Sequence, residues 1–130
     1  VENFGMERAE RISPAKAALE AGLPFTFHMD TPVLAPNMLD VLYCAMNRVT
    51  RSGVTLGADQ RLTAWEALLG VTRNAAYQYF EEDSKGTLEA GKRADLVVLS
   101  ANPLKTPKEQ MRSVQVVETY KDGVCVYQKG

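Results

Sequence analysis

The sequence GTLEAGKRADLVVL, at residues 86–99, marks a change in the structural pattern of the chain. Its last six residues form a nearly continuous apolar run, which is typical of a strand buried on both faces. Apolar residues follow a helical period before the acidic stretch at residues 81–84 and a strand-like period after it. We therefore expect a domain boundary at this stretch, with one domain over residues 1–82 and a second over residues 83–130.

Two further strands are expected downstream of this stretch. Runs rich in β-forming residues cover residues 114–120 and 124–127, and Lys-Asp-Gly joins them at residues 121–123. Asp-Gly between such runs is a strong hairpin signal, because both residues tolerate the positive φ angles of a tight turn. Between the first strand and the hairpin, residues 102–104 predict a turn and residues 107–111 a single helical turn.

Upstream, the pattern predicts helices. The charged residues 1–12 indicate a solvated helix or an arm. Ser13 is expected to be the N-cap of the next helix, with Pro14 at its first position and Gly22 at its end. A longer helix over residues 38–49 is expected because its apolar residues recur at i, i+3, i+4 and i+7.

Two shorter helices are expected between residues 63 and 80. Thr63 and Glu66 have the spacing of a capping box. Gly70 is expected to interrupt the first helix, and Thr72 is expected to cap a second helix over residues 73–80. Four aromatic side chains lie at helical spacing in this region, and core packing explains them better than ligand stacking: Trp65, Tyr77, Tyr79 and Phe80.

Residues 23–30, Leu-Pro-Phe-Thr-Phe-His-Met-Asp, predict a strand. The two phenylalanines alternate with Thr26 and His28, which is a period of two. The strand ends at Asp30, and α/β proteins tend to place chemistry at the carboxyl ends of strands. No other strand is expected in the first 80 residues, and a lone strand leaves its backbone N–H and C=O groups without partners.

Composition and charge exclude several classes of protein. The chain has 130 residues, with 15 Lys and Arg against 16 Asp and Glu. This balance leaves no basic excess for nucleic acid, and no apolar run approaches the roughly 20 residues of a membrane span. The N-terminus lacks a signal-peptide pattern, so we expect a cytoplasmic, reducing environment and two free thiols. With one histidine and two cysteines, the chain is not expected to build a zinc site alone, because such sites usually draw three or four ligands from His and Cys.

Several motifs resemble the amidohydrolase superfamily. Residues 86–99 closely match its C-terminal signature, which in family members reads G-[ST]-[LI]-x-x-G-K-x-A-D-[LI]-V-V-[LI]. Residues 11–16 and 22–32 resemble the family-3 branch, which carries R-[IV]-x-P-x-K and G-V-P-F-x-x-H-S-D-x-P. Further positions fit the same branch, namely Asn47-Arg48, residues 51–53, residues 66–68 and Thr72-x-Asn74-Ala75-Ala76. The resemblance covers nearly the whole chain.

The resemblance implies an α+β fragment of a larger fold. Family members combine a (β/α)8 barrel with a small β-sandwich, and this chain is similar to the last fifth to quarter of such a protein. Residues 25–30 would be barrel strand eight, residues 63–80 the closing helices, and residues 84–130 the C-terminal strands of the sandwich. Characterised members of the branch hydrolyse amide-type C–N bonds, as in N-acyl amino acids and N-substituted formamides.

The resemblance implies that Asp30 is both a catalytic residue and a metal ligand. It would accept a proton from the attacking water, whose pKa a metal lowers to about 7. The residue pattern alone favours a different interpretation, in which Asp30 caps Thr31 or the following turn. His28 would share a face with Asp30 and would contact the substrate, although a satisfied core histidine is an equally good interpretation.

The sequence departs from the family pattern at single positions and in its metal ligands. Met29 stands where Ser is usual, Asn37 where Asp is common, and Ser100 where an acidic residue often follows the strand. The family's remaining ligands, a His-x-His pair, a mid-barrel carboxylate or modified Lys and two later His, have no counterpart in this chain. We therefore expect a divalent metal, zinc, in the intact parent protein, and no metal or activity in this chain alone.

Other residues with reactive or charged side chains have simpler interpretations. Arg48 and Arg51 could bind a substrate carboxylate, but a solvated helix face is the interpretation that we favour. Cys44 is interpreted as a small apolar filler. Asp95 is expected to fix a turn through backbone hydrogen bonds.

Two functional hypotheses follow from the sequence. In the first, the chain is the C-terminal part of a metal-dependent hydrolase that acts on a small-molecule, amide-type substrate, with no nucleic-acid or membrane partner. In the second, it is a non-catalytic binding, regulatory or assembly module. Because residues 25–30 would lack barrel strands one and seven, we also expect this chain to self-associate.

Overall fold

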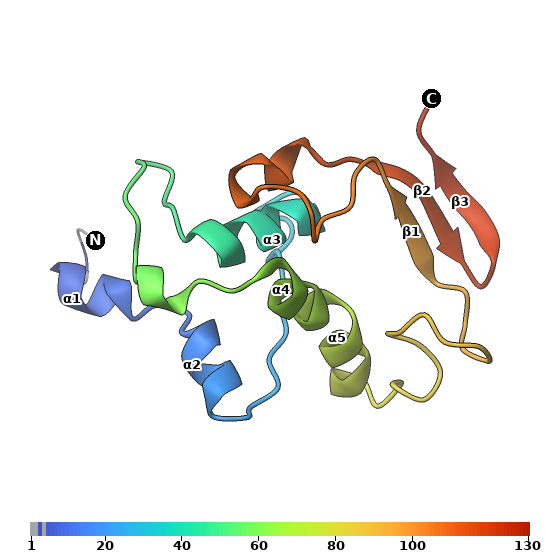
Figure 1. The fold of residues 1–130 in the computed structure, drawn as a ribbon, viewed down its shortest axis with the longest axis horizontal. Coiled ribbons are helices and arrows are strands. Elements are labelled where there is room, and N and C mark those ends of the chain that lie inside the picture. Colours follow the sequence, from blue (N-terminus) through green and yellow to red (C-terminus); the bar gives the residue numbers. More distant parts are fainter. Residues whose placement is uncertain (1–2, 4) are drawn as a thin grey trace.

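The computed structural model describes residue 3 and residues 5–130, and it has α+β architecture (Figure 1). Loops connect the helices, and a small sheet lies at the end of the molecule opposite the N-terminus. The helical elements are α1 (Gly5–Glu10), α2 (Ala15–Glu20), α3 (Met38–Asn47), the 3₁₀ turn Ala58–Gln60, α4 (Ala64–Val71), α5 (Arg73–Gln78) and the 3₁₀ helix Lys108–Ser113. The strands are β1 (Leu96–Leu99), β2 (Val116–Lys121) and β3 (Val124–Gln128).

Local sequence signals explain α3 and α4. The Asn37 side chain accepts a hydrogen bond from the backbone N–H of Leu39 and so caps α3. Thr63 and Glu66 form the expected capping box of α4, with the Thr63 N–H 2.7 Å from Glu66 Oε2. These two helix starts were therefore predicted correctly from residue type and spacing.

Several helix boundaries differ from the sequence predictions, including that of α3, which ends at Asn47 and not at residue 49. Pro14, not Ser13, is the N-cap of α2, and Ser13 adopts a left-handed φ of 49°. The helix α4 continues through Gly70 to Val71, and the missing side chain of this glycine leaves room for the rings of Phe25 and Phe27. The helix α5 ends at Gln78, two residues before the predicted end. The predicted helix or arm over residues 1–12 is a helix at Gly5–Glu10, and residues 1, 2 and 4 lie outside the described part.

The core lies between α3, α4 and the 3₁₀ helix Lys108–Ser113. Met111 is fully buried, and its buried neighbours come from both sides of the predicted domain boundary: Leu39, Leu42, Met46, Leu62, Ala67 and Val114. The Asn47 side-chain amide donates to the carbonyls of Tyr43 and Lys108, at 3.0 and 2.8 Å, so even the buried polar group joins the two parts. The division at residue 82 stays a prediction, and the core includes residues from both proposed domains.

The sheet has the antiparallel order β1-β2-β3. The predicted hairpin is confirmed, and its turn uses positive φ angles at Asp122 (49°) and Gly123 (79°). The prediction that β1 is buried on both faces is wrong, since Val97 is 53% exposed and Val98 40% exposed. In the described part of the chain, no second sheet or helix layer covers these side chains, so the apolar run forms an edge strand with accessible faces.

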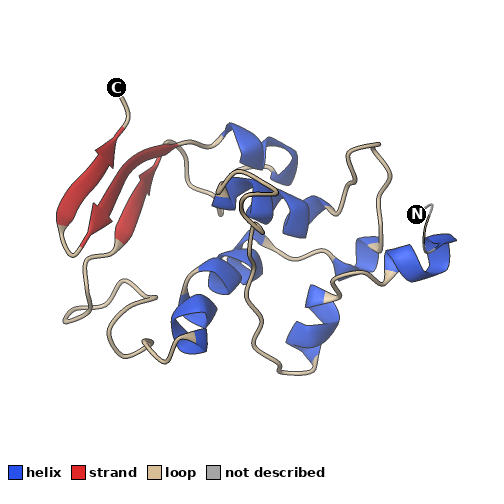
Figure 2. Ribbon diagram, turned by 180° about the vertical axis from the view of Figure 1, so that it is seen from behind, coloured by secondary structure: helices blue, strands red, loops and turns tan. Residues whose placement is uncertain are grey.

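The predicted strand over residues 25–30 is absent from the structure. Residues 23–30 are extended but unpaired, and Figure 2 shows this segment as part of the loop that joins α2 to α3. Among the described residues, the backbone groups of residues 26–29 make no hydrogen bond. The alternating pattern was thus correct for an extended conformation, but a strand also requires neighbours, which this chain does not supply.

No helix among the described residues is both long and apolar enough to cross a membrane.

Candidate functional site

The candidate site lies on the extended segment that ends at Asp30. Phe25 and Phe27 anchor this segment, with ring centroids 5.3 Å apart in an edge-to-face arrangement. Both rings pack against the hydrophobic core. Two polar contacts add to this anchor: Asn74 Nδ2 donates to the Phe25 carbonyl at 3.0 Å, and Thr26 Oγ1 donates to Gln78 Oε1 at 2.7 Å.

Asp30 lies where the extended segment turns away from the helices. Its side chain is exposed, and its φ of 55° is left-handed, so the extended conformation ends at this residue. Its carbonyl accepts a hydrogen bond from the N–H of Val33 at 2.8 Å, across a cis Thr31–Pro32 peptide. The Asp30 backbone therefore builds the turn, and its carboxylate is free of hydrogen bonds to other described residues.

His28 is also exposed, which argues against the core-histidine interpretation. The strand argument that put His28 and Asp30 on one face does not hold in this structure, because the positive φ at Asp30 breaks the alternation. The two side chains remain close in sequence, on an accessible segment. Their roles in substrate binding and catalysis stay predictions.

The residues present do not form a metal site by themselves. Within residue 3 and residues 5–130, no group of three or more His, Cys, Asp or Glu side chains is positioned to hold a metal ion. A single carboxylate is a weak ligand for a transition metal. A complete site at Asp30 would therefore need ligands from outside this chain.

A hollow of about 410 Å³ opens beside the start of the extended segment, not beside Asp30. Apolar residues of the α2–α3 connection line one side, and α4 and α5 line the other, including Leu23, Phe25, Leu69 and Tyr77. Glu82 also lines the hollow, and its buried Oε2 has no hydrogen-bond partner among the described residues. The hollow therefore does not coincide with the predicted catalytic residue.

Arg48 has a structural role that the sequence did not indicate. Its guanidinium donates to the carbonyls of Leu56 and Ile12, both at 2.6 Å, and of Ser13 at 2.9 Å. Burial lowers the pKa of this guanidinium below its ordinary value. Arg48 thus ties the N-terminal segment to the loop after α3, whereas Arg51 is exposed, as a solvated arginine should be.

The core-packing interpretation of the aromatic cluster is wrong. All four side chains are largely exposed, up to 89% for Phe80, so they form no part of the core: Trp65, Tyr77, Tyr79 and Phe80. Cys44 is likewise exposed and does not fill the core. Cys44, Trp65 and Tyr77 are exposed on α3, α4 and α5, and Tyr79 and Phe80 follow the end of α5. Helical spacing alone could not show which of these side chains would be covered.

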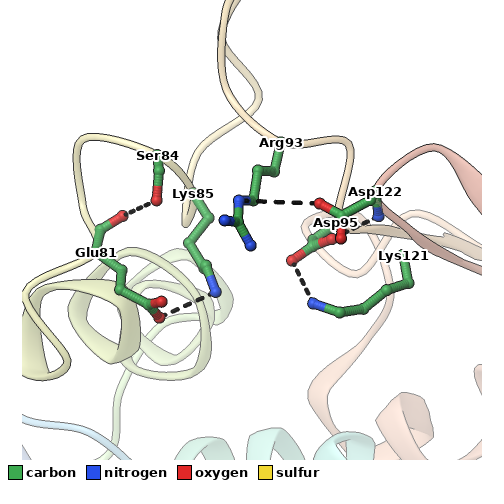
Figure 3. A network of polar contacts seen from close by, with 7 residues as sticks. All are labelled: Glu81, Ser84, Lys85, Arg93, Asp95, Lys121 and Asp122. Atoms are coloured by element: carbon green, nitrogen blue, oxygen red, sulfur yellow. Dashed lines mark hydrogen bonds and ion pairs between the residues drawn. The ribbon is translucent and has the colours of Figure 1, made fainter.

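Asp95 fixes a turn, in agreement with its sequence interpretation. Its carboxylate accepts from the backbone N–H of Asp122 at 2.8 Å and from Lys121 Nζ at 3.2 Å. These two hydrogen bonds, the backbone one first, lower the pKa of the Asp95 carboxyl. Figure 3 shows this group beside Arg93, which pairs with Asp122 at 3.9 Å.

The ion pair between Lys16 and Glu66 joins α2 to the start of α4. Lys16 Nζ lies 2.8 Å from Glu66 Oε1, and both side chains are mostly buried. The hydrogen bond to Lys16, followed by that from the Thr63 N–H, lowers the pKa of Glu66, and the bond to Glu66 raises the pKa of Lys16. Lys16 belongs to the motif at residues 11–16, and the structure gives it a stabilising contact with α4.

The residues that hold the candidate segment were not singled out from the sequence. Gly70 was expected to break a helix, yet it provides space for the Phe27 ring. Asn74 appeared only as a member of the Thr72-x-Asn74-Ala75-Ala76 motif. That motif was the one available signal, because the contact of Asn74 joins residues 49 positions apart.

Comparison with known proteins shows relatives over almost the whole chain. The model of the Amidohydrolase family matches residues 1–127. The N-substituted formamide deformylase of Arthrobacter pascens is 34% identical over 133 residues, covering 98% of this chain and 24% of that protein. The imidazolonepropionase of Streptococcus sanguinis is 31% identical over 122 residues, covering 93% of this chain and 27% of that protein.

A solved structure is also similar. The guanine deaminase of E. coli superposes with a TM-score of 0.62 at 26% identity, covering 88% of this chain and 30% of that one. The chain spans about a quarter of the length of the curated relatives it matches. The family match over residues 1–127 establishes that this chain belongs to the amidohydrolase family.

Proposed function

We propose that the chain is the C-terminal portion of a metal-dependent amidohydrolase that hydrolyses an amide-type C–N bond through a metal-activated water. The observation that carries this proposal is the family match over residues 1–127. Similarity to a protein named N-substituted formamide deformylase supports the bond type, because removal of a formyl group from nitrogen breaks a C–N bond. We propose a small amide-type molecule as the substrate and zinc as the metal.

In this proposal Asp30 contributes a carboxylate ligand, and the other ligands come from outside this chain. The accessible position of Asp30, at the end of the extended segment, is compatible with this role. Such a metal, when bound, lowers the pKa of its water to about 7. A carboxylate at Asp30 would be a suitable proton acceptor near neutral pH, and we propose that the exposed His28 contacts the substrate.

The same proposal explains the unpaired segment. Residues 25–30 correspond to strand eight of the barrel, with residues 1–82 as the end of the barrel and residues 83–130 as part of the β-sandwich. The similarity to E. coli guanine deaminase over 88% of this chain supports a fold larger than this chain. Alone, the chain lacks the other metal ligands and is inactive.

A metal and activity assay of the longer gene product tests the proposal. We expect stoichiometric zinc and hydrolysis of an N-substituted formamide, and we expect Asp30→Asn to lower kcat/KM by at least about 100-fold, as loss of a general base does. The matched control is Asp83→Asn, which makes the same change at an exposed carboxylate. Full activity in the Asp30→Asn variant would exclude the assigned role, and absence of bound metal would exclude the metal-dependent class.

A further inference from the structure

The segment that carries His28 and Asp30 is held by a stripe of residues at four-residue spacing on α4 and α5. The stripe consists of Gly70, Asn74 and Gln78, and each contacts the segment. In the structure, these contacts are in the place of the strand neighbours that residues 25–30 lack. The contacts of this stripe are therefore candidates for those that determine where Asp30 lies.

Each member of the stripe meets a different residue of the segment. A Cβ at Gly70 would lie 2.8 Å from two ring carbons of Phe27, so the ring occupies the space of the missing side chain. Asn74 Nδ2 donates to the Phe25 carbonyl at 3.0 Å. Gln78 Oε1 accepts from the hydroxyl of Thr26 at 2.7 Å.

These contacts determine the position of the segment along the helices. A shift of the segment by one residue would turn the phenylalanine rings away from Gly70 and the core, since successive side chains of an extended segment point to opposite sides. Of these three contacts, only that of Asn74 is made with the backbone of the segment. It therefore does not depend on the type of side chain at position 25. Asp30 follows the anchored residues by three positions.

We propose that Asn74 is a positioning residue for Asp30, acting through its hydrogen bond to the Phe25 carbonyl. The importance of that position for catalysis rests on the proposed function, in which Asp30 is a metal ligand. The contact itself does not depend on that function. Asn74 touches neither substrate nor metal and acts only by holding the segment.

The substitution Asn74→Asp separates positioning from folding. Asn74 lies in the first turn of α5, where a carboxylate favours the helix, so this variant keeps α5 while it removes the N–H donor. The control Asn102→Asp makes the same charge change at a distant turn and keeps the acceptor oxygen that binds the Leu104 N–H. Asn74→Gln, which keeps a donor, tests for rescue.

The measurement is ¹⁵N relaxation of the 130-residue chain at concentrations at which it is monomeric. We expect the order parameters of residues 26–30 to fall from about 0.85 to below about 0.6 in Asn74→Asp, with an unchanged thermal midpoint. Asn102→Asp should leave them unchanged, and Asn74→Gln should restore most of the loss. Unchanged order parameters in Asn74→Asp would overturn the proposal, and so would a loss of order spread over the whole chain.

This experiment needs neither metal nor substrate. If Asp30 proves not to bind metal in the longer protein, the proposed function fails while the relaxation result stands. If the order parameters do not respond to Asn74→Asp, the positioning role fails while the family assignment and the proposed hydrolysis stand.

Discussion

The core around Met111 and the segment at residues 25–30 are stabilised in opposite ways. The core is closed within this chain, with buried apolar side chains from α3, α4 and the 3₁₀ helix, and the buried Asn47 Nδ2 donates two hydrogen bonds. The segment is fixed by two rings and two polar contacts, and its backbone groups at residues 26–29 make no hydrogen bonds to described residues. The comparison shows that one chain can contain a finished core beside a strand-like segment that needs partners.

Truncation of the core should have the largest effect on stability. Met111→Ala removes a fully buried side chain and leaves a cavity, so we expect a loss of about 2–5 kcal/mol in the free energy of unfolding. Urea denaturation followed by circular dichroism measures this loss. Met38→Ala is the matched control, because Met38 is exposed; equal losses in the two variants would contradict a core centred on Met111.

A methyl group at Gly70 should disturb the contact between core and segment. Alanine within a helix normally stabilises by about 0.5–1 kcal/mol relative to glycine. Here the added Cβ would meet the Phe27 ring at 2.8 Å, so we expect Gly70→Ala to destabilise by about 1–3 kcal/mol instead.

The double variant Gly70→Ala with Phe27→Ala tests this cause. Removal of the ring should relieve the clash, so that Gly70→Ala costs less in that background than in the wild-type chain, as a thermodynamic cycle of urea midpoints would show. An equal cost in both backgrounds would mean that the ring is not the source of the strain.

Unpaired backbone groups in the segment should promote self-association of this chain. We expect light scattering to show a mass that rises with concentration, and Met29→Pro to weaken the association about 10-fold, because proline removes an N–H from the exposed edge. Val126→Lys, on the exposed strand β3, distinguishes association through the edge of the sheet from association through the segment at residues 25–30. A monodisperse monomer at all concentrations would contradict the expectation.

The smallest expected effect concerns the ion pair that joins α2 to α4. The pKa of Glu66 is lowered in the folded chain, so its ionised form stabilises the fold above the unfolded pKa near 4.5, and this stabilisation is lost as the pH falls through the folded value. Glu66→Gln keeps a side chain suited to the capping box and removes the charge. We expect it to cost at most about 1 kcal/mol at pH 7.

Urea midpoints across pH test this assignment. The difference between the wild-type chain and Glu66→Gln should shrink below pH 4.5, where the wild-type carboxylate becomes protonated. A difference that is the same at pH 3 and pH 7 would show that the charge of Glu66 contributes nothing.

Local signals predicted several features correctly because the residues concerned act on their own neighbours. The capping box at Thr63 and Glu66, the Asp122-Gly123 turn and the turn-fixing role of Asp95 all depend on contacts or backbone angles that short motifs specify. The motif at residues 86–99 likewise indicated the family, which the comparisons confirm.

Burial was predicted less well, because it depends on what covers a face. Val97 and Val98 of β1 and the aromatic residue Phe80 have side chains typical of a core, yet all three are exposed. The strand pattern at residues 25–30 has the same difficulty, since alternation specifies an extended backbone and not its neighbours. The candidate site at Asp30 was therefore located along the chain, while its surroundings could not be inferred.

The sequence by itself determined the family, the capping box at Thr63 and Glu66, the hairpin and the extended form of the segment before Asp30, because short motifs and periodicity act over a few residues. Only the tertiary structure decided that Arg48 ties two loops together, that Asn74 and Gly70 hold the segment, and that Phe80 faces outward. Those outcomes depend on contacts between residues far apart in the chain, for which a single sequence carries no local signal.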